Sequence, residues 1–173
     1  HILSTTNSNC LQKFFKNFLA NAIWSGVPKR GKWMESEDTK IPFVLLLSPS
    51  MRCNLRCTGC YAADYPKDSG LSYEEVDRIV GEARELGIHY MIILGGEPFF
   101  VDYMYKIYEK YNDVYFTPFT NGTLFNDEVA DKLCKLGNVM PMFSLEGFEE
   151  ETDSRRGKGI FKKVMEGMDL DRK

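Results

Sequence analysis

The chain has 173 residues, of which 43% are hydrophobic and 27% are charged, and its formal net charge is −3. This composition is typical of a globular domain with a buried core. The slightly acidic balance argues against nucleic acid as a partner. We expect no membrane span, because no apolar run reaches the roughly 18–20 residues that cross a bilayer, and the N-terminus lacks a signal-peptide pattern.

Residues 1–40 are predicted to precede the main domain. The polar residues 1–9 predict an unstructured tail. Apolar residues then recur at helical spacing and predict an amphipathic helix whose apolar face packs on the main domain. The residues of this face are Leu11, Phe14, Phe15, Phe18, Leu19, Ala22 and Ile23. A partner-binding or membrane-surface helix is the less favoured alternative, because only two lysines lie within it. Gly26-Val27-Pro28 is expected to end the helix, and residues 29–40 are expected to form a polar linker.

From residue 41 onward, short apolar runs alternate with amphipathic stretches. The apolar runs, which predict buried strands, are residues 43–47, 88–94, 114–119 and 139–145. The amphipathic stretches, which predict helices, are residues 73–86, 101–111, 127–136 and 161–170. Ser72 and Glu75 form a capping box at the first of these helices, and Asn126 can cap the third. Strands that alternate with helices predict βαβ units and a parallel α/β sheet with right-handed crossovers.

Three cysteines follow the first predicted strand with the spacing CxxxCxxC: Cys53, Cys57 and Cys60. Three thiolates within eight residues can hold one inorganic centre, and no fourth cysteine lies nearby to complete its coordination. A structural metal site has a closed shell, whereas a working site keeps one position open. The motif therefore predicts a cluster with one iron left for another ligand. The odd total of five cysteines indicates a reducing compartment, so we expect a cytoplasmic protein.

A zinc site is the alternative interpretation of this motif, because half of a zinc site has a similar pattern. It requires a fourth ligand, for which the candidates are Cys10, Cys134, His1 and His89. None of them has ligand-like spacing, and Cys134 lies within a predicted helix, where a small core residue is the simpler interpretation.

A glycine-rich motif, Leu94 to Pro98, follows the second predicted strand. Gly95 and Gly96 lack a Cβ atom, so their backbone can contact a ligand, and Glu97 adds a carboxylate beside it. The alternative is a tight turn with a surface glutamate.

Polar residues also follow the third and fourth predicted strands. Asn121 lies in a Thr-Asn-Gly turn after the third strand. Ser144 and Glu146 alternate with Leu145 at the end of the fourth, and a hydroxyl beside a carboxylate suits a polyol such as ribose. Arg156 lies near the same rim, and its guanidinium suits a carboxylate, although a solvated charge run is the alternative. In a parallel α/β sheet, the loops at the carboxyl ends of the strands build the site.

Four such motifs in this order, from about residue 41 to the C-terminus, resemble the radical S-adenosylmethionine (radical SAM) superfamily. The resemblance implies that Cys53, Cys57 and Cys60 bind a 4Fe–4S cluster, whose open iron is chelated by the methionine part of S-adenosylmethionine. It also implies that the motif of Gly95, Gly96 and Glu97 receives the methionine amino group.

The resemblance extends to the later strands. Ser144 and Glu146 match the position that contacts the ribose hydroxyls or the methionine end, and Arg156 matches an arginine that can pair with the carboxylate. Asn121 lies at the rim of the third strand. The implied reaction is reductive cleavage of S-adenosylmethionine to a 5′-deoxyadenosyl radical, which abstracts hydrogen from a substrate that the sequence does not identify. The electron donor would be a protein such as flavodoxin or ferredoxin.

Two features depart from the family pattern. The family has an aromatic residue just before the third cysteine, where this chain has Gly59, and Tyr61 is expected to take its place near the adenine. The family core is a partial barrel of six βα units, whereas residues 41–173 supply four. We therefore expect an incomplete core and a chain that is a fragment.

The alternatives to a radical SAM enzyme are a zinc-stabilised binding module and a non-catalytic iron–sulfur protein, although an electron carrier normally has four cysteines.

Overall fold

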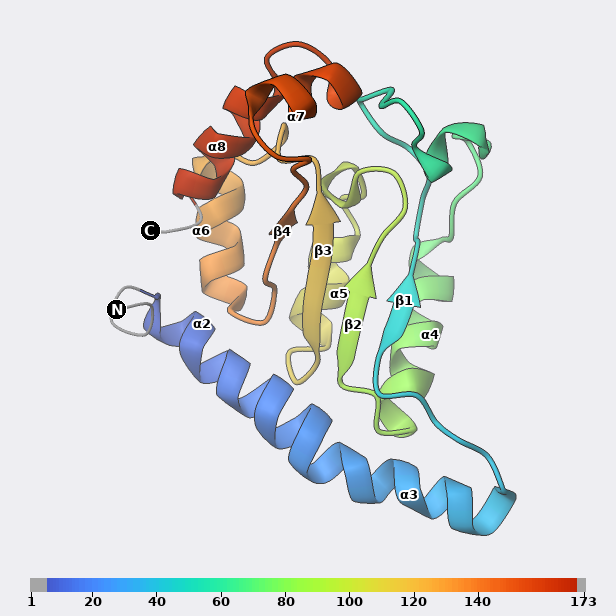
Figure 1. Ribbon diagram of the computed structural model, residues 1–173. Helices are drawn as coiled ribbons and strands as arrows, with labels where there is room; N and C mark the ends of the chain where they lie inside the picture. The colour runs from blue at the N-terminus through green and yellow to red at the C-terminus, as the bar shows by residue number, and fades with distance from the viewer. Residues whose placement is uncertain (1–5, 171–173) are drawn as a thin grey trace.

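A four-stranded parallel sheet forms the centre of the protein (Figure 1). The computed structural model describes residues 6–170. The strands lie side by side in chain order, as β1 (Leu45–Leu47), β2 (Tyr90–Ile93), β3 (Tyr115–Thr120) and β4 (Met142–Phe143). All three pairings are parallel, so the carboxyl ends of the four strands meet at one edge of the sheet. The predicted α/β class and its parallel sheet of four βα units are confirmed.

Helices cover one face of the sheet (Figure 1). The layer consists of α4 (Tyr73–Glu85), α5 (Met104–Lys110) and α6 (Asp127–Leu136). The remaining C-terminal helices are α7 (Glu149–Arg156) and α8 (Ile160–Leu170), and the short 3-10 helices are η2 (Tyr61–Asp64) and η3 (Pro98–Phe100). Within residues 6–170, no helix is both long enough and apolar enough to cross a membrane.

The core lies between the sheet and this helical layer. Its central residues are fully buried, namely Val76 and Val80 of α4, Ile107 and Tyr108 of α5, and Met91, Ile93 and Phe116 of the strands. The Tyr108 and Phe116 rings pack with their centroids 4.9 Å apart. Aromatic packing of this kind adds about 0.5–1.5 kcal/mol beyond the area buried. The apolar stripe of α5 therefore belongs to the core, as its spacing predicts.

The predicted helix caps are confirmed. The Ser72 hydroxyl accepts a hydrogen bond from the Glu75 amide at 3.2 Å, and the Glu75 carboxylate accepts one from the Ser72 amide at 2.7 Å. The Asn126 side chain caps α6, and Gly137 ends that helix with a φ of 72°. Left-handed φ values favour glycine, so the sequence specifies both ends of α6.

The N-terminal helix is longer than the sequence predicts. It runs without interruption through α2 (Ser8–Lys13), the π-helical η1 (Phe14–Ser25) and α3 (Gly26–Glu37), so the expected linker at residues 29–40 is helical as far as Glu37. Gly26 does not end the helix. A Cβ atom there would lie 2.9 Å from the Gly87 carbonyl oxygen, so the glycine allows close approach instead.

The π-helical segment also alters the predicted apolar face. Its i→i+5 hydrogen bonds change the angular spacing of the side chains, so residues chosen at α-helical spacing no longer share one face. Phe15, Leu19 and Ile23 are exposed, whereas Asn17 and Ala22 are fully buried. The prediction of a single seven-residue face is therefore wrong, although the helix does pack on the main domain.

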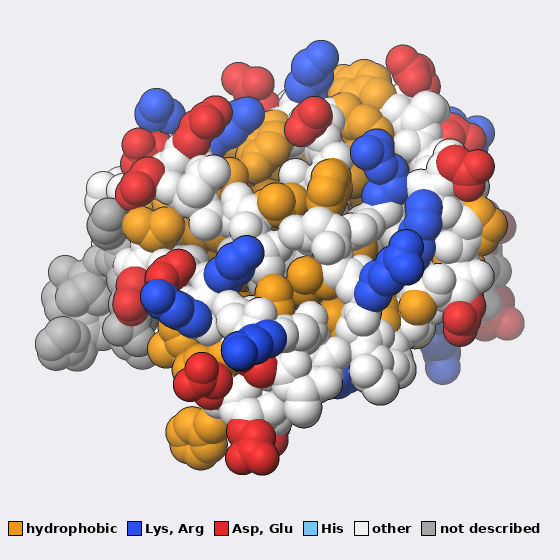
Figure 2. Space-filling view, turned by 90° about the horizontal axis from the view of Figure 1, so that it is seen from above, with side chains coloured by type: hydrophobic (Ala, Val, Ile, Leu, Met, Phe, Trp, Pro, Cys, Tyr) orange, Lys and Arg blue, Asp and Glu red, His pale blue; other side chains and the backbone are white. Residues whose placement is uncertain are grey.

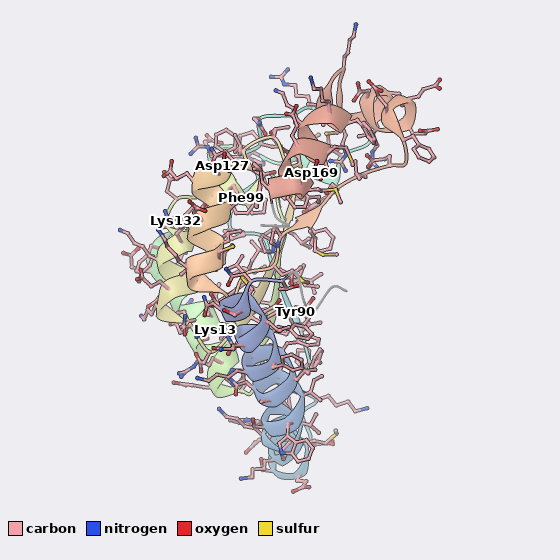
Figure 3. All side chains as sticks on the ribbon, turned by 90° about the vertical axis from the view of Figure 1, so that its left-hand side faces the viewer. Lys13, Tyr90, Phe99, Asp127, Lys132 and Asp169 are labelled. Carbon is pink, nitrogen blue, oxygen red and sulfur yellow. The ribbon has the colours of Figure 1, made fainter. Side chains whose placement is uncertain are left out.

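The N-terminal helix crosses the amino end of the sheet (Figure 3). The Phe18 ring lies 5.1 Å from the Tyr90 ring, and the Phe14 ring lies 5.7 Å from the Tyr115 ring. The Asn17 side-chain amide donates to the Asn112 carbonyl oxygen at 2.8 Å.

The predicted unstructured tail covers residues 1–9. Of these, residues 1–5 lie outside the described part, and the helix already begins at Ser8.

Three further details differ from the prediction. Strand β1 is limited to three residues, and Leu46 is 58% exposed because it lies on the face without helices. Strand β4 has only two residues. Helix α7 is not predicted at all, because its sequence Glu-Glu-Glu-Thr-Asp-Ser-Arg-Arg has no apolar periodicity and Thr152 is its one buried residue.

We predict that Ser72→Ala lowers the free energy of unfolding by about 1 kcal/mol, because the Glu75 amide loses its acceptor. Urea denaturation monitored by circular dichroism measures this change. The control is Ser36→Ala at an exposed position of α3, which should change stability by less than about 0.5 kcal/mol. Equal effects of the two substitutions would contradict the capping role.

Candidate functional site

The motifs singled out in the sequence lie at the carboxyl edge of the sheet, which Figure 2 views from above. The cysteine loop follows β1, the glycine motif follows β2, Asn121 follows β3, and Ser144 and Glu146 follow β4. Basic, acidic and apolar side chains lie interspersed on this face (Figure 2).

The glycine motif packs directly on the backbone of the cysteine loop. The Gly96 amide donates to the Ser50 carbonyl oxygen at 2.9 Å, and the Glu97 amide donates to the Arg52 carbonyl oxygen at 2.8 Å. A Cβ atom at Gly95 would overlap the Ser50 carbonyl, and one at Gly96 would overlap the Arg52 carbonyl. Gly95 also has a φ of 109°, which side chains rarely adopt. Both glycines are therefore required for the two loops to meet.

Glu97 is buried and holds neighbouring strand ends together. Its carboxylate accepts hydrogen bonds from the Asn121 amide at 2.8 Å, the Thr120 hydroxyl at 2.8 Å and the Phe99 amide at 3.2 Å. Burial raises the pKa of this carboxyl group, and the three donors oppose that rise. Glu97 is 1% exposed, so the alternative of a surface glutamate is wrong. Both carboxylate oxygens are occupied by donors of the chain itself.

Asn121 connects the third strand to the first cysteine. Its side-chain Nδ2 lies 3.6 Å from the Cys53 sulfur and donates to the Asn54 side-chain oxygen at 2.9 Å. Its side-chain Oδ1 accepts from the Thr123 backbone amide at 2.9 Å. These contacts fix the Asn121 side chain against the cysteine loop.

The three cysteines lie on one loop as free, half-buried thiols. The Cys60 amide donates to the Cys57 carbonyl oxygen at 3.3 Å, and Gly59 between them has a φ of 67°. A positive φ at the third position is typical of a type II turn and favours glycine. This turn accounts for Gly59 at the position where the family has an aromatic residue.

The electrostatic surroundings of Cys57 combine burial with a nearby cation. Burial raises the pKa of the Cys57 thiol, while the Arg156 guanidinium lowers it and the neighbouring Cys60 and Cys53 raise it. Across residues 6–170, no group of three or more His, Cys, Asp or Glu side chains converges on a single metal ion. Thiolates that bind different irons of a 4Fe–4S cluster do not need such convergence, and three cysteine thiols on one short loop are the donor chemistry of such a cluster.

Tyr61 contacts the glycine motif. Its hydroxyl accepts a hydrogen bond from the Gly95 amide at 2.9 Å and lies 3.3 Å from the Gly95 carbonyl oxygen, to which it can donate. The Tyr61 side chain is otherwise exposed. The hydroxyl therefore links the residue after the third cysteine to the backbone of Gly95 and Gly96, which we call the glycine rim. The sequence does not predict this contact.

Glu146 and Arg156 pair with each other. The Arg156 guanidinium forms a two-pronged pair with the Glu146 carboxylate, at 2.6 and 2.9 Å, and Arg155 adds a third bond at 2.7 Å. The Arg156 guanidinium lowers the pKa of the Glu146 carboxyl group. Ser144 is held through its backbone, since its amide donates to the Thr120 carbonyl oxygen at 3.0 Å. Among residues 6–170, the Ser144 hydroxyl forms no hydrogen bond with Glu146.

Sequence reasoning missed several residues that build this site. They are Ser50, Arg52, Asn54, Thr120 and Arg155. Thr120 has a detectable signal, because it directly precedes Asn121 at the end of a strand. Ser50 and Arg52 have none, because they act through backbone carbonyls that all residues share, and the partners of Asn54 and Arg155 are remote in the sequence.

The candidate fourth ligands of a zinc site lie elsewhere. His89 directly precedes β2 at the amino edge of the sheet, where its ring nitrogen lies 3.2 Å from the Asp113 carbonyl oxygen. Cys134 lies in the last turns of α6, and its carbonyl oxygen accepts from the Asn9 side chain of α2, the helix that contains Cys10. His1 lies outside the described residues.

A cavity of about 510 Å³ opens beside the cysteine loop. It is bordered by Ser50 and Arg52 on one side and by Phe100, Asp102 and Lys106 on the other. None of the three cysteines and neither glycine of the rim lines it. The cysteines and glycines of these motifs therefore lie outside this cavity.

A parallel α/β sheet with a three-cysteine loop folded onto a glycine rim is the arrangement of a radical SAM domain. The family model described as the radical SAM superfamily matches residues 47–173. The chain belongs to the radical SAM superfamily, and the resemblance stated from its motifs is confirmed. Members of this family are enzymes that use a 4Fe–4S cluster and S-adenosylmethionine.

Two curated relatives show the extent of the similarity. An Fe-coproporphyrin III synthase of Methanosarcina barkeri is 32% identical over 130 residues, which cover 72% of this chain and 33% of the relative. A GTP 3′,8-cyclase of Desulforamulus reducens is 32% identical over 142 residues, which cover 73% of this chain and 43% of the relative. The chain thus spans about a third to two fifths of the length of these relatives.

A solved structure supports the fold. Streptococcus suis SuiB bound to S-adenosylmethionine superposes with a TM-score of 0.64 over 79% of this chain and 33% of that chain, at 24% sequence identity. At this identity the match shows the fold alone.

We predict that Gly96→Ala destabilises the protein by about 1–3 kcal/mol or more, because the new Cβ would overlap the Arg52 carbonyl. The matched control is Gly31→Ala in α3, where a Cβ meets nothing within 4 Å. This control should be neutral or stabilising by up to about 1 kcal/mol. Chemical denaturation measures both changes, and a harmless Gly96→Ala would contradict the close approach of the two loops.

We also predict a pH-dependent stability difference between the wild type and Glu97→Gln. Burial raises the folded-state pKa of Glu97 above its ordinary value of 4.5. The stability associated with the protonated form is therefore present below pH 4.5 and is lost as pH rises through the folded-state pKa. The stability of the wild type relative to Glu97→Gln should fall across this interval, as measured by denaturation between about pH 4 and pH 8. A relative stability that rises with pH would contradict the sign.

Proposed function

We propose that this chain binds a 4Fe–4S cluster and S-adenosylmethionine and takes part in reductive cleavage of that nucleoside. Cys53, Cys57 and Cys60 are the proposed cluster ligands. The observation that carries the proposal is the docking of the glycine rim onto the cysteine loop through the Ser50 and Arg52 carbonyls. That docking brings the donors for a cluster and an open backbone rim to the same edge of the sheet.

Charged and polar groups surround the proposed cluster ligands. A thiolate is the form that binds iron; burial raises the pKa of the Cys57 thiol, and the Arg156 guanidinium offsets part of that rise. Asn121 places an N–H beside the Cys53 sulfur, and hydrogen bonds to cluster sulfurs tune the reduction potential. Leu55 adds an apolar side chain within the same loop, in keeping with exclusion of water.

The glycine rim is the proposed site for the methionine amino group. A backbone carbonyl has two lone pairs, so the Gly95 oxygen can accept an ammonium while it still contacts the Tyr61 hydroxyl. Glu97 acts in this proposal by holding the rim, since its carboxylate is already occupied by chain donors.

The residues after β4 are proposed to contact the rest of the nucleoside. Arg156 is held by the Glu146 carboxylate, and its charge interacts with the Cys57 and Cys60 thiols. Ser144 and Glu146 are the proposed partners of the ribose hydroxyls or the methionine end. A bound cluster would supply the one electron for reductive cleavage of S-adenosylmethionine to methionine and a 5′-deoxyadenosyl radical. The residues of this chain bind and orient the reactants.

Several aspects of the whole protein belong to the same proposal. The electron would come from a flavodoxin-like or ferredoxin-like protein, and the radical would abstract hydrogen from a substrate of undefined class. A cytoplasmic location and a domain boundary near residue 40 are also proposed. Neither alternative function is favoured. The candidate zinc ligands Cys134 and His89 lie away from the cysteine loop, and an electron carrier normally has a fourth cysteine.

We predict that Cys57→Ala abolishes assembly of a four-iron cluster under anaerobic reconstitution, because one of three thiolate ligands is lost. The measurement is iron and sulfide content per chain, together with the brown absorbance of the cluster. The matched control is Cys134→Ala in α6, which should retain the wild-type iron content. Full iron content in Cys57→Ala, or bound zinc without iron in the wild type, would contradict the proposal.

A further inference from the structure

Helix α7 reaches the cysteine loop from the other side of the sheet edge (Figure 1). Two hydrogen bonds join them at Thr58, which lies between the second and third cysteines. The Thr58 amide donates to the Arg155 carbonyl oxygen at 2.8 Å, and the Arg155 side-chain Nε donates to the Thr58 carbonyl oxygen at 3.2 Å. The backbone amide and the backbone carbonyl of Thr58 are thus both hydrogen-bonded to Arg155.

The Arg155 side chain is itself fixed. Its guanidinium bridges two acceptors, because Nε donates to Thr58 while Nη1 donates to the Glu146 carboxylate at 2.7 Å. Arg156 holds the same carboxylate through its own two bonds. Such a planar fork can serve two acceptors in fixed geometry, which a lysine ammonium does less well.

Helix α7 is also anchored to its surroundings. Thr152 is fully buried, and its hydroxyl accepts from the Glu146 amide at 3.3 Å. The Asp153 carboxylate accepts from the Gly159 amide at 2.5 Å and from the Phe161 amide at 2.8 Å, which ties the end of α7 to the start of α8. Arg155 therefore extends from an anchored helix onto the short cysteine loop.

The turn that Arg155 holds has little support of its own. Its internal bond from Cys60 to Cys57 is 3.3 Å long, and Gly59 at its centre meets nothing that a Cβ would touch within 4 Å. Glycine also raises the conformational entropy of the loop before it is ordered. Outside the turn, the Ala63 amide donates to the Cys60 carbonyl oxygen at 3.1 Å, and the contact with α7 restrains the Thr58 backbone between Cys57 and Cys60.

We infer that Arg155 is a positioning residue that presents Cys57 and Cys60 to iron by holding both backbone groups of Thr58. The inference rests on the proposed function, because it takes these cysteines as cluster ligands. Arg155 does not contact the cluster in this account. It acts through the turn, and the neighbouring Arg156 acts through its charge.

Arg155→Ala and Arg155→Lys test the inference in the full chain. After anaerobic reconstitution to equal iron content, Arg155→Ala should lose iron to a ferrous chelator about tenfold faster than the wild type. The substitution removes the side-chain bonds to Thr58 and Glu146, whereas the bond from the Thr58 amide to the backbone carbonyl of residue 155 is kept. Arg155→Lys should remain faster than the wild type, because one ammonium cannot serve Thr58 and Glu146 together. The matched control is Lys158→Ala, which removes an exposed cation from the connection between α7 and α8. This variant should release iron at the wild-type rate.

Amide hydrogen exchange of the iron-free protein gives a second readout. Arg155→Ala should speed exchange in residues 54–60 about tenfold and leave exchange in β3 unchanged, which separates local loosening from global destabilisation. Wild-type iron release or unchanged exchange in Arg155→Ala would overturn the inference, as would full rescue by Arg155→Lys. If the wild type takes up no iron, the proposed function fails, and the exchange comparison still decides whether Arg155 orders the turn.

Discussion

The site depends on close backbone contact between the loop after β1 and the loop after β2. Two amides of the glycine motif donate to the Ser50 and Arg52 carbonyls, and neither glycine has room for a side chain. Because Arg52 directly precedes Cys53, this contact places the cysteine loop over the carboxyl edge of the sheet. Glu97 then connects the glycine motif to the end of β3, since its buried carboxylate accepts a hydrogen bond from the Asn121 backbone amide. Backbone contacts therefore determine where the cysteine loop begins, directly before Cys53.

The fold could be predicted from the sequence wherever local chemistry decides the structure. The caps at Ser72 and Asn126 were correct because a side chain there bonds a nearby amide. The path through Gly26 could not be predicted, because the reason for that glycine is contact with Gly87, which is remote in the sequence. Helix α7 (Glu149–Arg156) was missed because it buries almost no apolar surface and is fixed by hydrogen bonds at its ends.

The candidate site could be predicted as a set of motifs but not as a network. The glycine motif and the cysteines were found because their residue types and spacing are distinctive. Glu97 was expected to lie beside a ligand, but its burial depends on the neighbouring strand and cannot be read from its own segment. The contacts of Tyr61 with Gly95 and of Arg155 with Thr58 join segments 34 and 97 residues apart, and a single sequence contains no signal for such pairs.

The central claim is that three thiolates hold a four-iron cluster and leave one iron open to S-adenosylmethionine. The most direct measurement is the Mössbauer spectrum of the protein reconstituted with iron-57, recorded before and after addition of S-adenosylmethionine. The account predicts that one iron of the four changes its isomer shift and quadrupole splitting when the nucleoside binds, while the other three keep thiolate-like parameters. Four irons that do not respond to the nucleoside, or a protein that takes up no four-iron cluster, would contradict it.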